Sequence, residues 1–245
     1  MFPIRDHNPS GRTPYVVYAL ITLNVALYLV TLVIKSDPNA LALFYANWAV
    51  VPFRITDGTN YLSLISSMFL HGGLLHLAGN MLFLWIFGDN LEDEMGHVIF
   101  LAFYLIGGVG SGLIHVMSAP GSIIPTVGAS GAIAAVMGGY LLLYPKARVD
   151  IIIILIVFFK IFPVPAWVLL GLWFGVQLLG GVNSDPTTGG VAYWAHAGGF
   201  IIGLILLIPL WLKRGGTRFW SVNHGHPPHP ENVYSPSRIP KIQRK

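Results

Sequence analysis

Cysteine is absent from this sequence of 245 residues, and charged residues make up only 10% of it. The absence of cysteine excludes a disulfide framework and a thiolate metal site. The scarcity of charge excludes an ordinary soluble domain, in which about 25% of the residues are charged. The chain also has no H-E-x-x-H motif for a catalytic zinc ion and no pair of aspartates within an apolar run. Most of the surface is therefore expected to face lipid.

Hydrophobic residues make up 54% of the chain and gather in long runs. About 20 mostly apolar residues are needed for a helix to cross the hydrocarbon core of a bilayer. Six runs meet this length or come close to it. They cover residues 15–34, 74–87, 98–117, 130–144, 166–179 and 191–212. The sequence therefore predicts an all-α fold, a polytopic membrane bundle of six transmembrane helices.

The segments outside these runs define the expected organisation of the chain. Residues 1–14 form a polar N-terminal segment, 15–212 the membrane domain, and 213–245 a polar tail expected to be disordered or bound to a surface. The polar residues ahead of the first run, and the length of that run, favour an uncleaved signal anchor. Residues 39–69 are expected to form an interfacial loop with short amphipathic helices. The apolar stretch 151–159 is too short to cross and is expected at the interface.

The distribution of basic residues predicts the orientation. Six spans place both termini on one side, and the other side then holds only Lys35 and Arg54. The basic residues on the side of the termini are Arg5, Arg12, Lys146, Arg148, Lys160, Lys213, Arg214, Arg218, Arg238, Lys241, Arg244 and Lys245. Because lysine and arginine gather on the cytoplasmic side, we expect a protein of the cell (inner) membrane with both termini in the cytoplasm. The net charge of +4 follows this pattern, so the expected partner is membrane lipid and not nucleic acid.

Three polar sites lie inside the apolar runs, where polar side chains are rare and usually functional. They are His76 with Asn80, then Ser130, and then His196. In the expected topology their three spans all enter from the outer face, and each site lies near the start of its span. At 1.5 Å per residue, Asn80 and His196 lie roughly 8–9 Å below their helix starts, and Ser130 lies in the first turn. All three sites therefore fall in one layer near the outer face.

The residue types in this layer suit nucleophilic catalysis. Ser130 lies within the sequence GASG, whose glycines allow close backbone approach at a helix start. The helix N-terminus offers unpaired N–H groups and a positive dipole end, which a developing oxyanion requires. A serine needs a base within hydrogen-bond reach, and His196 is the candidate at matching depth. Since no carboxylate lies in this layer, the residues favour a Ser–His dyad, with Asn80 and His76 as candidate oxyanion donors.

Each of these residues also has an ordinary structural explanation. A serine at a helix start is usually a cap, and a histidine or asparagine in a span can bond a neighbouring helix. Two glycine pairs at a spacing of four fit helix-packing seams, namely Gly199 with Gly203 and Gly108 with Gly112. The histidines of the tail suggest a metal site only weakly, and we predict no metal. The joint pattern of spacing, order and depth favours a catalytic site.

Three motifs together resemble the rhomboid family of intramembrane serine proteases. They are His76-Leu77-Ala78-Gly79-Asn80, Gly128-Ala129-Ser130-Gly131 and Ala195-His196-Ala197-Gly198-Gly199. The motifs follow the order of the family and fall on the second, fourth and sixth expected spans. The resemblance extends from about Tyr15 to Leu212, with six helices as in the basic bacterial form.

The resemblance implies a role for each matching residue. Ser130 is similar to the family's nucleophile and His196 to its general base and acid. His76, Asn80 and the backbone N–H of Ser130 are similar to its oxyanion hole. His71 lies at a position where the family often has a structural histidine.

The resemblance also implies a substrate and an entry path. The family cleaves single-pass transmembrane proteins, at small residues, without a cofactor. The segment 39–69 resembles its lateral loop, and the run 166–179 with the loop 183–190 resembles its gate and cap. Many relatives have an aromatic residue four positions after the nucleophile, on which the histidine stacks; this chain has Ala134.

Two other functions stay open at this point. A catalytically inactive relative that binds transmembrane helices would share the same motifs, and labelling by a serine-directed probe would separate it from a protease. A small transporter with a proton-relaying histidine layer is the second alternative. That function would be expected to need intramembrane carboxylates or an inverted repeat, and the sequence has neither.

Overall fold

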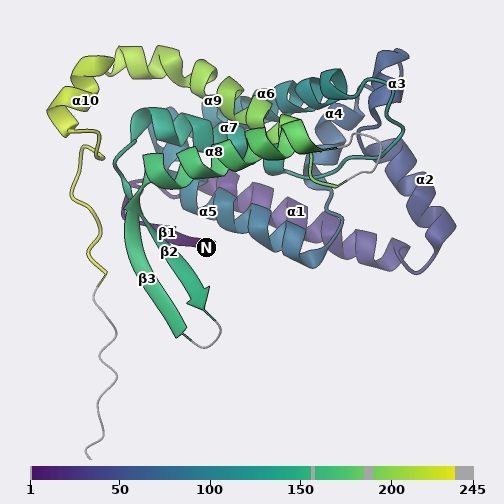
Figure 1. Cartoon of the computed structure of the whole chain (residues 1–245), viewed down its shortest axis with the longest axis horizontal. Helices are drawn as coiled ribbons and strands as arrows, with labels where there is room; N and C mark the ends of the chain where they lie inside the picture. The colour runs from purple at the N-terminus through teal and green to yellow at the C-terminus, as the bar shows by residue number, and fades with distance from the viewer. Residues whose placement is uncertain (1, 156–157, 185–189, 235–245) are drawn as a thin grey trace, which may run out of the picture.

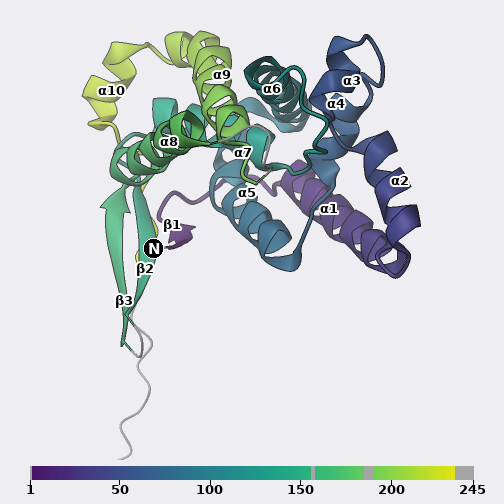
Figure 2. The same cartoon turned by 45° about the vertical axis from the view of Figure 1, so that its right-hand side comes forward.

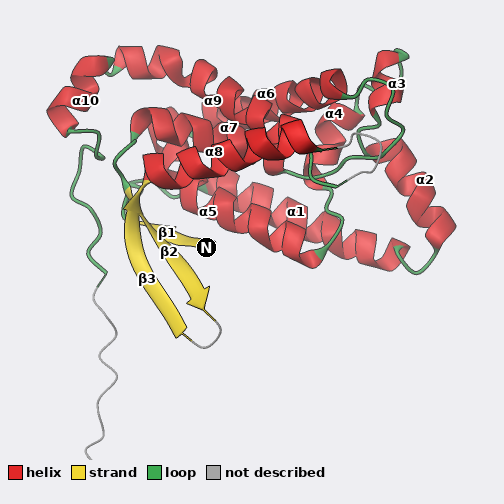
Figure 3. Ribbon diagram, viewed as in Figure 1, coloured by secondary structure: helices red, strands yellow, loops and turns green. Residues whose placement is uncertain are grey.

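The computed structural model describes residues 2–155, 158–184 and 190–234 (Figure 1). The helices run side by side in a bundle, and a small antiparallel sheet lies at one end of it (Figure 3). The expected fold class, a helical membrane bundle, is confirmed. The count of six membrane spans remains a prediction, because not every helix is long enough to cross a bilayer.

Each of the six predicted runs corresponds to one helix. These helices are α1 (Tyr15–Ile34), α5 (Leu74–Met95), α6 (His97–Ser118), α7 (Ser130–Leu143), α8 (Ala166–Asn183) and α9 (Tyr193–Lys213). By length and composition, α1, α6, α8 and α9 can each cross a membrane, and α5 joins them if the bent helical segment before it belongs to the same span. The remaining helix, α7, has only 14 residues. Its length of about 21 Å is less than the roughly 30 Å of the hydrocarbon core.

The segment between α1 and α5 forms short helices, as predicted. They are α2 (Pro38–Trp48), α3 (Pro52–Thr56), α4 (Ser63–Ser66) and the 3₁₀ helix η1 (Ser67–Phe69). Asp37 caps α2, because its carboxylate accepts the backbone N–H groups of Asn39 and Ala40. The chain turns by 95° between the segment 63–69 and α5. This turn brings α5 into the bundle.

The short helix α7 lies inside the bundle, in contact with α5, α6, α8 and α9 (Figure 2). Every residue from Gly131 to Tyr140 is buried. The closest neighbour of α7 is α9, because glycines lie where the two helices touch. A Cβ atom at Gly203 would lie 1.9 Å from the carbonyl oxygen of Ala135. A Cβ atom at Gly199 would lie 2.2 Å from the carbonyl oxygen of Gly131. The two helices therefore pack backbone against backbone, as the glycine spacing predicts.

The sheet is the main feature that the sequence analysis did not anticipate. It has three antiparallel strands in the order β1 (Phe2–Asp6), β2 (Arg148–Leu155) and β3 (Phe158–Pro165). The stretch 151–159 thus belongs to a hairpin, which extends away from the helices (Figure 1). Residues 156–157 lie outside the described part of the chain. Four successive isoleucines at 151–154 explain the strand, because β-branched residues favour extended backbone.

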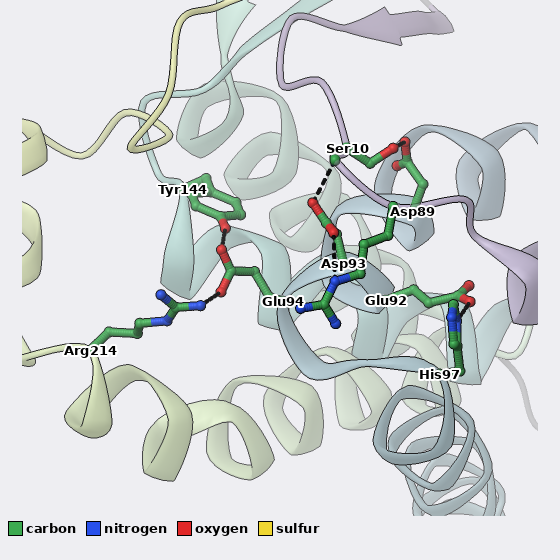
Figure 4. A network of polar contacts seen from close by, with 10 residues as sticks. Ser10, Asp89, Glu92, Asp93, Glu94, His97, Tyr144 and Arg214 are labelled. Carbon is green, nitrogen blue, oxygen red and sulfur yellow. Dashed lines mark hydrogen bonds and ion pairs between the residues drawn. The ribbon is translucent and has the colours of Figure 1, made fainter.

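The second predicted span ends later than expected. Its helix, α5, continues through Gly88, Asp89 and Asn90 to Met95, because its acidic last turns find partners there (Figure 4). The buried carboxylate of Glu92 accepts a 2.5 Å hydrogen bond from His97, and Glu94 lies between the hydroxyl of Tyr144 and the guanidinium of Arg214. These contacts tie the end of α5 to the neighbouring helix ends.

The tail was expected to be disordered or bound to a surface, and the part of it that the structure describes contacts the rest of the chain. Residues of the tail form α10 (Thr217–Asn223), and the chain then returns to the sheet. The backbone N–H of Asn232 donates to the carbonyl of His7 at 2.9 Å, and the hydroxyl of Tyr234 donates to the carbonyl of Asp6 at 3.0 Å. Both ends of the described chain therefore meet at one end of the bundle. Residues 235–245 lie outside the described part.

Candidate active site

Ser130 is the first residue of α7. Before it, Gly128 has a φ of +139°, in a region of backbone conformation that favours glycine. Its backbone N–H donates to the carbonyl of Ser67 at 2.9 Å, which fixes the entry to the helix. Because Ser130 lies in the first turn, its backbone N–H is one of the helix's orphan donors and points away from the helix body.

His196 lies one turn into α9 and faces Ser130. The hydroxyl oxygen Oγ of Ser130 and the ring nitrogen Nε2 of His196 are 2.7 Å apart, a normal hydrogen-bond distance. Ser111, on α6, contacts the same turn of α9, because its hydroxyl donates to the carbonyl of Ala195 at 2.8 Å. The structure thus brings together the two side chains on which the sequence hypothesis depends.

His76 and Asn80 approach the same point from α5. A Cβ atom at Gly128 would lie 2.8 Å from Nε2 of His76, so the imidazole lies directly against the turn before Ser130. The amide nitrogen Nδ2 of Asn80 donates to Nε2 of His71 at 2.9 Å. His71 is fully buried, and its ring orients the amide of Asn80. This contact is more specific than the structural role that the sequence suggested for His71.

A cavity of about 860 Å³ connects these residues. Its lining includes Ser130, His196, His76 and Asn80. A row of polar side chains along α6 and the loop after it, including Ser111 and His115, lines the cavity as well. Of the predicted cap loop, Ser184 and Gly190 border the cavity, and residues 185–189 lie outside the described part of the chain. A cavity of this size, with polar side chains among an otherwise apolar lining, has room for water and a peptide backbone beside Ser130.

One further residue contacts the pair, and the sequence analysis missed it. The side-chain oxygen Oε1 of Gln177, on α8, lies 2.8 Å from Nδ1 of His196. The indole of Trp173, one turn earlier on α8, lies 5.9 Å from the imidazole of His196 between ring centroids. Gln177 is the only strongly polar residue in the apolar run 166–179. A polar side chain inside a span is itself a functional signal, and it was available in the sequence.

The arrangement has the parts needed for acyl transfer. A hydroxyl is bonded to an imidazole, backbone N–H groups and the positive end of a helix dipole lie beside it, and two polar side chains approach from a third helix. Within the described residues, no three His, Asp or Glu side chains gather in a group suited to hold a metal ion. The geometry of Ser130 and His196 therefore points to a nucleophilic serine.

Comparison with known proteins gives a family match. The model of the Rhomboid domain family matches residues 58–213, which include Ser130, His196, His76 and Asn80 and all of the cavity lining except Val50. RHOMBOID-like protein 4 of Arabidopsis thaliana is 30% identical over 162 residues, which are 63% of this chain and 36% of that protein. Rhomboid protein 1, mitochondrial, of Saccharomyces cerevisiae is 30% identical over 156 residues, 60% of this chain and 41% of that protein.

A third relative is the human presenilin-associated rhomboid-like protein, mitochondrial, which is 29% identical over 171 residues. The match covers 66% of this chain and 38% of that protein. The chain thus matches less than half of the length of each of these three relatives.

Proposed function

Because the chain belongs to the rhomboid family, we propose that it is an intramembrane serine endopeptidase acting through a dyad of Ser130 and His196. The observation that carries the proposal is the 2.7 Å hydrogen bond between Ser130 Oγ and His196 Nε2. The bond joins two helices at the wall of the cavity. A packing role alone would not require a hydroxyl, a base and a helix N-terminus to converge on one accessible point.

The proposed reaction proceeds in two halves. In the first, His196 Nε2 takes the hydroxyl proton while Oγ of Ser130 attacks the scissile carbonyl carbon. The tetrahedral intermediate then collapses, the C–N bond breaks, and the imidazolium gives its proton to the leaving amine. In the second, His196 takes a proton from water as its oxygen attacks the acyl ester. The bond between the acyl carbon and Oγ then breaks, the imidazolium returns the proton to Oγ of Ser130, and the carboxylic acid product leaves. The reaction needs no cofactor.

The negative oxygen of the intermediate is expected to lie at the N-terminus of α7. The backbone N–H of Ser130 is one donor there. His76 is a second, because its Nε2 lies against the backbone of Gly128. Asn80 is a third, since its amide lines the cavity and is oriented by His71.

The proposed substrates are single-pass transmembrane proteins. A helical substrate hides its carbonyl groups within its own hydrogen bonds, so the segment to be cut must unwind before Ser130 can reach it. Small residues favour such unwinding and fit close to the helix start. The helix α8 borders the cavity through Trp173, which supports sideways entry past this helix.

We also propose that both termini lie in the cytoplasm of a cell with the protein in its inner membrane, and that the dyad lies near the outer face. The distribution of lysine and arginine supports this orientation. The contact of Asn232 and Tyr234 with the N-terminal residues supports a common side for the two ends.

The test is cleavage of a panel of single-pass proteins, together with covalent labelling by a fluorophosphonate probe, by the purified protein in liposomes. Ser130→Ala is expected to lose both activities while its thermal unfolding midpoint, Tm, is retained. Ser36→Ala is a matched control, because this exposed serine only donates to the carbonyl of Val33, and it is expected to keep both. Undiminished cleavage by Ser130→Ala would rule the proposal out. A wild type that binds transmembrane peptides but is neither labelled nor active would instead be an inactive relative.

A further inference from the structure

We propose that Gln177 is a positioning residue that holds the imidazole of His196 in the tautomer needed for general-base catalysis. This inference rests on the proposed function, since it assigns a role to a side chain that touches the base and not the substrate. Gln177 lies on α8, whereas Ser130 and His196 lie on α7 and α9. The base would thus be held from a third helix.

The orientation of the Gln177 amide follows from its second hydrogen bond. Its nitrogen Nε2 donates to the backbone carbonyl of Trp173, one turn earlier on α8, at 3.2 Å. The opposite orientation would place the amide oxygen against that carbonyl oxygen, and two acceptors cannot bond each other. The oxygen Oε1 therefore faces His196, 2.8 Å from Nδ1.

An acceptor at this position selects the tautomer of the ring. Because Oε1 can only accept, the proton of the neutral imidazole is held on Nδ1. The lone pair of Nε2 then faces Ser130 Oγ, at 2.7 Å, ready to take the hydroxyl proton. With the other tautomer, Nε2 would carry the proton and donate to Oγ, and the base would be lost.

The burial of Gln177 argues against a role in packing alone. The side chain is only 6% exposed, and the other buried positions of α8 are Ala166, Leu170 and Gly181. An apolar residue would fill this position without the cost of desolvating an amide. The nitrogen and the oxygen of the amide each have a hydrogen-bond partner, which offsets the cost of burying them.

The neutrality of the amide suits its location. A carboxylate would orient the ring equally well, but an ionised side chain within a membrane span is costly. Trp173 adds a second restraint, since its ring lies 5.9 Å from the imidazole with the planes inclined by 31°. Two residues of α8 thus hold His196 where Ala134, on α7, offers no aromatic surface.

The experiment compares three variants of the full chain in liposomes. Gln177→Met keeps the approximate volume and removes the acceptor, Gln177→Glu restores an acceptor, and Asn24→Leu is the control. Asn24 is a buried amide on α1 that also donates to a carbonyl one turn earlier, that of Leu20 at 2.7 Å, and it is not among the residues that line the cavity. We would measure kcat and KM on a single-pass substrate, the rate of fluorophosphonate labelling of Ser130, and Tm.

Gln177→Met is expected to lower kcat by about 10- to 1,000-fold, less than the loss caused by a wrong tautomer in a triad enzyme. The labelling rate should fall in parallel, because a small probe needs the base but not substrate docking, and KM and Tm should change little. Gln177→Glu should recover most of kcat, and Asn24→Leu should match the wild type in kcat and in labelling rate.

Several results would overturn the inference. One is a Gln177→Met variant with wild-type kcat and labelling. Another is a change confined to KM, which would assign Gln177 to the substrate path. A third is an equal loss in the Met and Glu variants with a lowered Tm, which would indicate a structural role. In each case Ser130-dependent cleavage would persist in the wild type, so failure here is distinct from failure of the proposed function.

Discussion

The carboxylate of Glu92, near the end of α5, accepts the backbone N–H of Val17, in the first turn of α1, at 2.8 Å. Its other oxygen accepts the N–H of Val16 at the same distance. Two of the orphan donors at the start of α1 are thereby satisfied, and the negative charge lies at the positive end of the helix dipole. One side chain thus joins the first two long helices of the bundle.

Glu92→Ala is therefore expected to destabilise the protein strongly. Glu92 is 1% exposed, and its removal leaves two backbone donors without partners, at a cost of about 2–4 kcal/mol. Arg12→Ala is the control, because Arg12 is largely exposed and lies 3.6 Å from Asp93; its loss should cost at most about 1 kcal/mol. Denaturant unfolding in detergent micelles measures both, and equal losses would contradict the assignment.

His196→Ala tests the base independently of substrate cleavage. The hydroxyl of Ser130 would keep its place but lose the acceptor of its proton, so labelling by a fluorophosphonate should fall to the background seen with Ser130→Ala. The measurement is the labelling rate at matched protein concentration. A normal rate in this variant would remove His196 from the proposed mechanism.

Asn80→Ala tests the proposed oxyanion hole. Loss of one donor is expected to lower kcat by about 10- to 1,000-fold, as for single oxyanion donors in serine hydrolases, with KM nearly unchanged. Steady-state cleavage of a single-pass substrate measures this effect. An unchanged kcat would show that the amide serves only its hydrogen bond to His71.

Asp6 should make stability depend on pH. Burial, and secondarily the charge of Asp89, raises the pKa of Asp6 from its ordinary 3.8 to about 8. The folded state therefore binds a proton more tightly than the unfolded state. The resulting stability is fully present below about pH 4 and is lost as the pH rises through about 8.

The variant Asp6→Asn isolates this effect, because it cannot titrate and keeps an oxygen to accept from the hydroxyl of Tyr140, which lies 2.8 Å from the carboxylate. Its Tm should exceed that of the wild type at pH 9, and the difference should shrink toward zero near pH 4. Tm measured across this range checks the prediction. A constant difference would show that Asp6 does not titrate in the window.

The helices and the polar residues of the cavity could be predicted because lipid-facing helices and catalytic sites each have recognisable residue patterns in a sequence. The run 15–34 predicts α1 at both of its ends, since an uninterrupted apolar segment allows few alternatives to a spanning helix. His76, Asn80, Ser130 and His196 were found because polar residues are rare at membrane depth. The structure brings all four to one cavity.

The sequence analysis missed the hairpin and the contacts of Gln177 for different physical reasons. The stretch 151–159 is continuously apolar, and such a run shows neither the period of a helix nor that of a strand. The sequence analysis placed this stretch at the membrane interface because of its length alone, although its isoleucines favour a strand. The polarity of Gln177 is visible in the sequence, but its partner is not. The side chain reaches His196 through the packing of α8 against α9, and no local pattern records a contact between distant segments.

The central place of α7 has a consequence for how the dyad responds to its surroundings. A helix that faces lipid tilts or kinks when bilayer thickness changes, but the residues of α7 from Gly131 to Tyr140 are covered by protein. Acyl chains therefore exert no direct force on the segment that carries Ser130. The Ser130–His196 distance is expected to be the same in thin and thick bilayers, with the outer helices absorbing the mismatch.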